Sequence, residues 1–396
     1  MTVIATPASL QAPKLKALPP LSLYIHIPWC VKKCPYCDFN SHAAPGDVVE
    51  REAAYVAALT RDLETAIPQI WGRKIVSVFF GGGTPSLFSA KSIDAILAAV
   101  RTLLPLDNYA EITLEANPGT FEAQKFADFR AAGINRLSIG IQSFNAQHLQ
   151  ALGRIHDDAE AHRAIKIALR NFDNINLDLM YALPNQTLDE ARQDITTAAT
   201  YGVPHISAYH LTLEPNTLFH RYPPPLPDDD TAATMQDMIE KTLAEKNYAN
   251  YETSAFAHTG YESRHNRNYW LFGDYLGIGA GAHSKISLPE KITRQMRYKQ
   301  PQEYMTQAMN GTPIQEQHEV DRDARSFEFM MNALRLRDGF KVAMFQERTG
   351  LPITAIAAQL DDAERRGLIV RDHQHIKPTL LGRRFLNDLL QLFLRA

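Results

Sequence analysis

The 396-residue sequence contains only three cysteines, and all of them lie within eight residues, at Cys30, Cys34 and Cys37. An odd, closely grouped set of thiols does not make a framework of disulfides. It favours a metal-binding loop in a reducing compartment. We therefore expect the three thiols to act together as ligands.

Long apolar stretches are also missing. No run of eighteen or more apolar residues occurs, and the uncharged stretch from Ile75 to Ala90 is broken by three glycines and a proline. A helix that crosses a bilayer needs about 20 apolar residues, so we expect no transmembrane segment. Residues 1–20 have no basic start followed by an apolar block, as a secretory signal would have. We expect a cytoplasmic protein.

Neither sign of charge is in large excess. The chain has 41 Lys and Arg residues against 44 Asp and Glu residues, which gives a formal net charge of −3. Proteins that bind nucleic acid usually gather basic residues to replace the counterions of the phosphates. We therefore expect no nucleic-acid partner, and small molecules or proteins as partners.

Apolar runs typical of strands recur at intervals of roughly 30 residues and alternate with segments of helical periodicity. The expected strands are Leu21–Ile27, Ile75–Phe80, Glu111–Ala116, Arg136–Ile141, Ile175–Leu183 and His205–Leu213. The expected helices are Val49–Ile67, Ala90–Leu104, Phe121–Ala132, Ala159–Arg170 and Leu188–Tyr201. Such alternation predicts an α/β fold with a parallel sheet, either an incomplete (β/α)6 barrel or an open sheet. Its active site belongs at the carboxyl ends of the strands.

We divide the chain into four regions. They are an N-terminal arm (1–20), a partial barrel (21–250), a connecting region (251–320) and a C-terminal domain (321–396). In the C-terminal domain a pair of helical segments precedes a short hairpin and a final helix, which predicts a winged-helix-like α+β domain. Such folds often bind DNA, but Lys and Arg outnumber Asp and Glu only seven to five from Leu351 onward, so we favour a packing or docking role.

Three thiolates can hold a [4Fe-4S] cluster while leaving one iron open, whereas a closed cluster normally takes four. An open iron is a place where a small molecule can coordinate. A Cys3His zinc site with His26 or His42 is the alternative, although zinc sites usually pair two short Cys/His hooks and this chain has one.

A strand runs directly into the glycines of Gly81–Ser86, and bare glycines let a backbone approach a ligand closely. Alone, this is only a tight turn. At a strand end it predicts a cradle for the amino and carboxylate groups of a methionine. Four polar residues follow later strand ends and together supply donors and acceptors, although each alone can be a solvated surface residue. They are Glu115, Gln142, Arg154 and Asp178.

Five motifs together resemble the radical-SAM family that contains oxygen-independent coproporphyrinogen III dehydrogenase and the HemW-like haem chaperones. They are Tyr24–Phe39 with its Cys-x3-Cys-x2-Cys loop, Gly81–Ser86, Leu114–Pro118, Ser138–Ser143 and Gly153–His156. The resemblance extends from Leu21 to the C-terminus. It implies a [4Fe-4S] cluster, S-adenosylmethionine (SAM) and an electron donor whose electron allows SAM to be cleaved to a 5′-deoxyadenosyl radical.

The same resemblance implies roles for particular residues. Tyr24 and Tyr36 would flank the cluster and the cofactor, and Gly82, Gly83 and Thr84 would bind the methionine end of SAM. The residues that would bind SAM, or a second SAM, are Glu115, Gln142, Arg154, Asp178 and Thr212.

Two departures separate the members of this family. The dehydrogenase carries a fourth cysteine two residues after the third, where this sequence has Phe39, and it has a longer N-terminal arm. Both features favour a haem chaperone. The segment His265-Asn266-x-x-Tyr269 matches a pattern associated with haem binding in the chaperones, and His and Tyr are both known iron ligands. Alternatively, Asn266 caps a helix while Tyr269 fills a core.

We therefore expect a haem chaperone that binds haem and a SAM-ligated [4Fe-4S] cluster. It would pass haem to acceptor haemoproteins, for example respiratory-chain enzymes. The alternatives are the dehydrogenase, which decarboxylates coproporphyrinogen III, and a zinc-stabilised binding module without redox chemistry.

Overall fold

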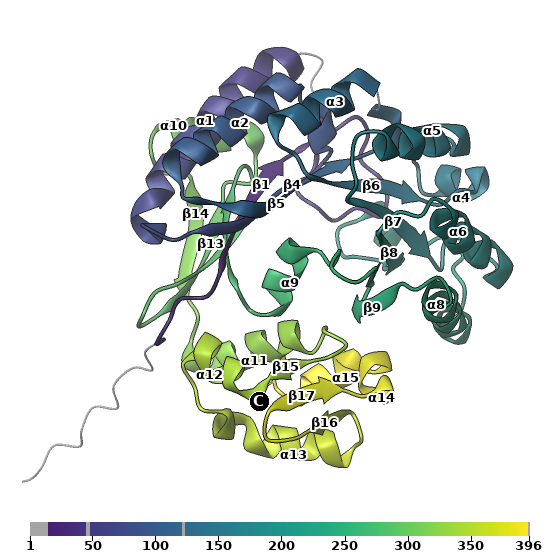
Figure 1. Ribbon diagram of the computed structural model, residues 1–396, viewed down its shortest axis with the longest axis vertical. Coiled ribbons are helices and arrows are strands. Elements are labelled where there is room, and N and C mark those ends of the chain that lie inside the picture. Colours follow the sequence, from purple (N-terminus) through teal and green to yellow (C-terminus); the bar gives the residue numbers. More distant parts are fainter. Residues whose placement is uncertain (1–14, 45–47, 121–122, 395–396) are drawn as a thin grey trace, which may run out of the picture.

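A single curved sheet organises most of the protein (Figure 1). The computed structural model describes residues 15–44, 48–120 and 123–394. Six strands run parallel and are neighbours in chain order. They are β1 (Leu21–Ile27), β4 (Ile75–Gly82), β5 (Leu106–Ala116), β6 (Arg136–Gln142), β7 (Ile175–Tyr181) and β8 (His205–His210). The six predicted strands are confirmed.

Helices cover the outer, convex face of this sheet (Figure 1). The main ones are α1 (Val48–Ile70), α2 (Ala90–Leu103), α3 (Ala123–Ala132), α5 (Asp158–Leu169), α6 (Leu188–Thr200) and α8 (Asp229–Ala244). Residues 121–122 of the predicted third helix lie outside the described residues. The parallel strands and the outer helices confirm the predicted α/β partial barrel.

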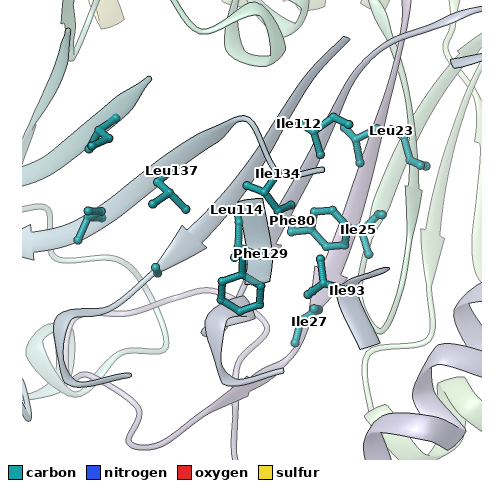
Figure 2. Packing of buried hydrophobic residues seen from close by; sticks show 14 of the residues in the cluster. Leu23, Ile25, Ile27, Phe80, Ile93, Ile112, Leu114, Phe129, Ile134 and Leu137 are labelled. Atoms are coloured by element: carbon teal, nitrogen blue, oxygen red, sulfur yellow. The ribbon is translucent and has the colours of Figure 1, made fainter. Parts of the chain in front are cut away.

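The alternation of side chains along each strand separates a packed layer from a polar interior. In β1, Leu23, Ile25 and Ile27 pack with residues such as Phe80 and Leu114 in one apolar cluster (Figure 2). The residues between them face the opposite side, because successive strand residues point to opposite faces. On that concave side the polar Ser22 hydroxyl of β1 meets the Ser77 hydroxyl of β4 at 2.8 Å. The barrel interior is therefore built for polar contacts.

Residues 251–320, expected to be a connecting region, contribute several strands to the same sheet. Strand β11 (Asp274–Ile278) pairs in parallel with β1, and β12 (His283–Ser287), β13 (Ile292–Arg297) and β14 (Ile314–Glu319) continue the sheet antiparallel. At the other edge β10 (Ala255–Ala257) and β9 (Ala249–Glu252) follow β8. Two helices, α9 (Arg264–Trp270) and α10 (Pro301–Met309), complete this region.

The glycine-dense segment around β11 marks a close approach of two strands. A Cβ on Gly279, whose φ is +104°, would lie 2.3 Å from the carbonyl oxygen of His26 at the end of β1. A Cβ on Gly277 would lie 2.1 Å from the carbonyl oxygen of His283. These glycines therefore allow β11 to pack against its neighbours, which the sequence pattern alone does not distinguish from a loop.

The C-terminal domain has the predicted winged-helix-like arrangement. Its helices are α11 (Arg322–Ala333), α12 (Val342–Thr349), α13 (Ala357–Arg365), α14 (Leu380–Arg384) and α15 (Leu386–Gln391). Its small sheet has the order β15 (Phe340–Lys341), β17 (His375–Pro378), β16 (Ile369–Arg371). The predicted last helix is interrupted at Phe385. The domain lies on the open side of the barrel, with α9 between them (Figure 1).

Among the described residues, no helix combines the length and the hydropathy that crossing a membrane requires.

Candidate functional site

The carboxyl ends of all six parallel strands border one cavity of about 640 Å³. The three cysteines line it together with nine of the twelve residues expected to bind a cofactor. Those nine are Tyr36, Gly82, Gly83, Thr84, Glu115, Gln142, Arg154, Asp178 and Thr212. Residues that are up to about 180 positions apart in the sequence thus meet in one place, because parallel strands end at the same edge of a sheet.

The cysteine loop presents three free, half-buried thiols to this cavity. A hydrogen-bonding group approaches each sulfur: Thr84 Oγ1 lies 3.6 Å from Cys30 Sγ, Arg154 Nη1 lies 3.7 Å from Cys34 Sγ, and Ser41 Oγ lies 3.8 Å from Cys37 Sγ. Burial raises the pKa values of the Cys30 and Cys37 thiols, which a bound metal would overcome by favouring the thiolate. The loop fits thiolate ligation.

The histidines considered for a zinc site are engaged elsewhere. His26 Nδ1 lies 3.0 Å from the Tyr24 hydroxyl, and His26 Nε2 lies 2.9 Å from the Asn40 carbonyl oxygen. His42 Nε2 lies 3.2 Å from Asn40 Oδ1. These contacts give the cysteines no histidine as a fourth ligand, and they favour a cluster held by three thiolates.

Asn40 fixes the cysteine loop to the late strands of the sheet. Its side-chain amide donates to the carbonyl oxygens of Ala280 and Lys299, each at 2.9 Å. A Cβ on Gly281, whose φ is +76°, would lie 2.3 Å from that amide nitrogen. The position of the loop therefore depends on residues about 240 to 260 positions further along the chain.

The glycine turn lies against the same loop. The Gly83 N–H donates to the Ile27 carbonyl oxygen, and the Thr84 N–H donates to the Trp29 carbonyl oxygen, both at 2.8 Å. A Cβ on Gly83 would lie 2.5 Å from that Trp29 oxygen. Only glycine therefore fits at position 83, where the turn lines the cavity.

Asn117, which was not predicted as a binding residue, joins the glycine turn to Arg154. Its amide nitrogen donates to Thr84 Oγ1 at 2.9 Å, and its amide oxygen accepts from Arg154 Nη2 at 2.6 Å. Arg154 Nη2 also donates to the Gly140 carbonyl oxygen at 2.9 Å. Gln142 has a φ of +67°, an unusual conformation that is often found at functional sites.

Two buried carboxyl groups in the cavity can pair with positive charge. Burial, together with the nearby Asp178, raises the pKa of Glu115 to about 8. Burial also raises the pKa of Asp178, although Ser138 donates a hydrogen bond to it at 2.7 Å. A cationic ligand would stabilise both carboxylates. SAM carries a sulfonium and an amino group, so the site matches its charge.

We expect SAM affinity to rise with pH because Glu115 must lose a proton to attract the cation. The pKa of about 8 in the free protein predicts about a tenfold change in affinity per pH unit below that value. Equilibrium dialysis between pH 6.5 and pH 9 measures this. Glu115→Gln is the control, because it removes the titration of Glu115 and keeps that of Asp178 and of the ligand. Identical pH profiles in both proteins would contradict the expectation.

Tyr24, His265 and Tyr269 lie outside the residues that line the cavity. His265 is 3% exposed, and its ring stacks on Phe79 at 4.8 Å between centroids. Its Nδ1 lies 3.0 Å from Ser77 Oγ, while its Nε2 has no hydrogen-bond partner among the residues that the structure describes. Burial lowers the pKa of His265 to about 3, so its imidazole is neutral.

The motif around His265 forms helix α9. The helix is capped by Ser263, whose hydroxyl accepts from the Asn266 N–H at 3.2 Å, so Asn266 is not the capping residue. Tyr269 packs beside His265, with ring centroids 5.2 Å apart, and stacks on Tyr275 at 4.2 Å. The helix thus presents His265 and Tyr269 to each other and to the barrel interior.

Several residues of the cavity wall were not predicted from the sequence to be binding residues. Ser138 and Gly140 belong to a predicted strand, so their place in the wall follows from that strand once the alternation of its faces is known. Tyr209 belongs to β8, at the far end of the parallel strands. Arg335 comes from the C-terminal domain, and no local pattern near it indicates a contact with the barrel.

The partial barrel and the three-cysteine cavity define a radical-SAM protein. In agreement, the family model of the Radical SAM superfamily matches residues 24–198, and that of the HemN C-terminal domain matches residues 320–385. The chain is 47% identical to "Heme chaperone HemW" of Escherichia coli (strain K12), over 95% of this chain and 99% of the relative. It is 48% identical to the protein of the same name from Haemophilus influenzae, over 95% and 98%. The chain belongs to the HemW family of radical-SAM proteins.

A solved structure shares the fold. Coproporphyrinogen III oxidase (HemN) from Escherichia coli, a radical-SAM enzyme, matches with a TM-score of 0.80 and 22% identity, over 95% of this chain and 90% of that one. Membership of the radical SAM superfamily implies a [4Fe-4S] cluster and SAM, and the thiols and the polar wall described above fit both.

Proposed function

We propose that this protein binds haem and a SAM-ligated [4Fe-4S] cluster, and transfers haem to acceptor haemoproteins. The observation that carries the proposal is the 47% identity, over nearly the whole of both chains, to a protein named as a haem chaperone. Haem enzymes of the respiratory chain are the kind of acceptor we propose, and the cytoplasm is the compartment. A separate electron donor would reduce the cluster.

The residues of the cavity have distinct roles in this proposal. Cys30, Cys34 and Cys37 hold the cluster, which when bound supplies one-electron chemistry to SAM. The backbone of Gly82 and Gly83 and the Thr84 hydroxyl receive the methionine end of SAM. Glu115, Gln142, Arg154, Asp178 and Thr212 orient the rest of it, and Tyr36 limits the space around the cluster, whereas Tyr24 lies behind the wall and acts through His26. These assignments rest on the lining of one cavity by most of the named residues.

We propose that haem is bound at a site that includes His265 and Tyr269. The neutral imidazole of His265 has a free Nε2, which is the form that ligates iron. Because His265 is 3% exposed, haem iron reaches it only when α9 moves away from β4. The proposal therefore includes a conformational change of α9.

The competing function is the decarboxylation of coproporphyrinogen III. Phe39 argues against it, since the dehydrogenases that the sequence resembles have a cysteine at that place. Its ring is 61% exposed at the cavity, where it supplies no thiol. The shared fold with HemN does not decide between the two functions, because a fold alone does not specify an activity.

We expect the anaerobically reconstituted protein to bind haem with a defined Soret band and to form no protoporphyrinogen from coproporphyrinogen III with SAM and a reductant. His265→Ala should shift the band or weaken binding, because an axial ligand is lost. His265→Gln, which keeps a polar contact to Ser77, controls for destabilisation of α9. Identical haem titrations would remove His265 from the site, and sustained decarboxylation would overturn the chaperone function.

A further inference from the structure

Arg335 is the residue of the C-terminal domain that reaches the cavity. It follows helix α11, and its backbone is fixed to the edge of the barrel. The Thr253 hydroxyl donates to the Arg335 carbonyl oxygen at 3.5 Å, Leu336 forms a bridge to Glu252, and the Arg337 N–H donates to the Tyr251 carbonyl oxygen at 3.1 Å. The side chain of Arg335 therefore enters the cavity from an anchored position.

The Arg335 guanidinium lies over the indole ring of Trp270, 5.1 Å from its centroid. Trp270 is the last residue of α9, the helix that carries His265 and Tyr269. This cation–π contact holds the guanidinium beside Trp270 and uses none of its N–H groups as hydrogen-bond donors. Among the described residues these N–H groups find no hydrogen-bond or ion-pair partner, whereas Arg154 is bonded to Asn117, Gly140 and Cys34.

Arg335 and the cysteine loop approach the cavity from different sides. The loop follows β1, at one end of the series of parallel strands, while Arg335 lies beside the residues that follow β8 and β9 at the other end. A ligand bound at the cluster would therefore have Arg335 on the side of the cavity away from the cysteine loop. Burial raises the pKa of the nearby Glu252 carboxyl to about 7, so it is only partly ionised at neutral pH and does not fully offset the arginine charge.

We propose that Arg335 binds a carboxylate of the ligand in this cavity. A guanidinium with free N–H groups matches a carboxylate in a two-point contact. The carboxylate has two sources, a propionate of haem or the methionine carboxylate of SAM, and the position opposite the cysteine loop favours the propionate. The assignment to a haem propionate rests on the proposed function, whereas the assignment to the SAM carboxylate does not.

The first arm of the test compares haem with haem dimethyl ester, in which both propionates are neutral. The parent protein should bind haem more tightly than the ester by roughly 10- to 100-fold, the range for a charge-assisted hydrogen bond. Arg335→Gln should bind the two equally, and Arg335→Lys should recover some of the preference because it keeps the charge. Arg337→Gln is the matched control, since Arg337 is exposed two residues away and does not line the cavity.

The second arm compares SAM with decarboxylated SAM by equilibrium dialysis in the same four proteins. If Arg335→Gln no longer distinguishes SAM from decarboxylated SAM but still distinguishes haem from its dimethyl ester, Arg335 binds the carboxylate of SAM. Unchanged discrimination in both arms would overturn the role of Arg335. A parent protein that binds no haem would contradict the proposed function instead, and the SAM arm would then decide the role of Arg335 alone. Thermal unfolding of each variant checks that the domain contact is retained.

Discussion

Alanine at any one of Cys30, Cys34 and Cys37 should abolish binding of the iron–sulfur cluster. The chain has no other cysteine, so no thiol can replace the one that is lost. The three thiols line one cavity, and the nearby histidines are bonded to other groups. Iron and sulfide content and the EPR spectrum after anaerobic reconstitution measure the result. We expect only background amounts of both elements in each variant.

Ser41→Ala is the matched control for this experiment, because its hydroxyl lies 3.8 Å from Cys37 Sγ in the same loop but is not a thiol. It should keep a full cluster. One zinc ion per chain without sulfide in the parent protein would contradict the radical-SAM assignment and restore the zinc-stabilised binding module. Cluster retention in a cysteine variant would show that the remaining two thiolates suffice.

Gly83→Ala should weaken SAM binding strongly and should also disturb the cluster. The added methyl group would overlap the Trp29 carbonyl oxygen, 2.5 Å away, next to Cys30. The turn and the cysteine loop must then move apart, which costs about 1–3 kcal/mol for this kind of overpacking, or roughly 5- to 150-fold in affinity. SAM-induced changes in the EPR spectrum of the reduced cluster, together with the iron content, measure both effects.

Gly119→Ala controls for the loss of a glycine near the same site. A Cβ at position 119 would lie 3.5 Å from Ile155 Cδ1, which is an ordinary contact. Its SAM response and iron content should equal those of the parent protein. A normal response in Gly83→Ala would show that the turn can yield without affecting the ligand, and the glycine would then serve the fold alone.

Most of the cavity could be predicted from the sequence for a physical reason. Apolar residues recur along β1, β4 and β7, with polar residues such as Ser22, Ser77 and Asp178 on the inward face, and the glycine turn and further polar residues stand where the strands end. Glu115 and Gln142 stand at such ends, and the structure brings both to the cavity with Cys30. The periodicity of the sequence therefore predicted both the fold and the residues at the strand ends that line the cavity.

The features that the sequence did not reveal depend on contacts between distant segments. Strands β9 and β10 are short, and β14 is largely exposed, so none of them shows an apolar run. The sequence pattern indicates His265 as a haem ligand but does not reveal that Phe79 and Ser77 of β4 enclose it. Arg335 reaches the cavity only because its backbone is bonded to the edge of the barrel. The local sequence pattern contains no information about such contacts between distant segments.

The bonds from Asn40 to Ala280 and Lys299 bear on the order in which the protein matures during synthesis. The ribosome makes the cysteine loop early, at about 5–20 residues per second, and β11 more than 200 residues later. For tens of seconds β1 lacks its neighbour β11, and the loop lacks the carbonyl oxygens that hold Asn40. A nascent chain therefore exposes three thiols on an unanchored loop. We expect iron and sulfide to be delivered after translation has passed Lys299, when the loop has the contacts that fix its shape.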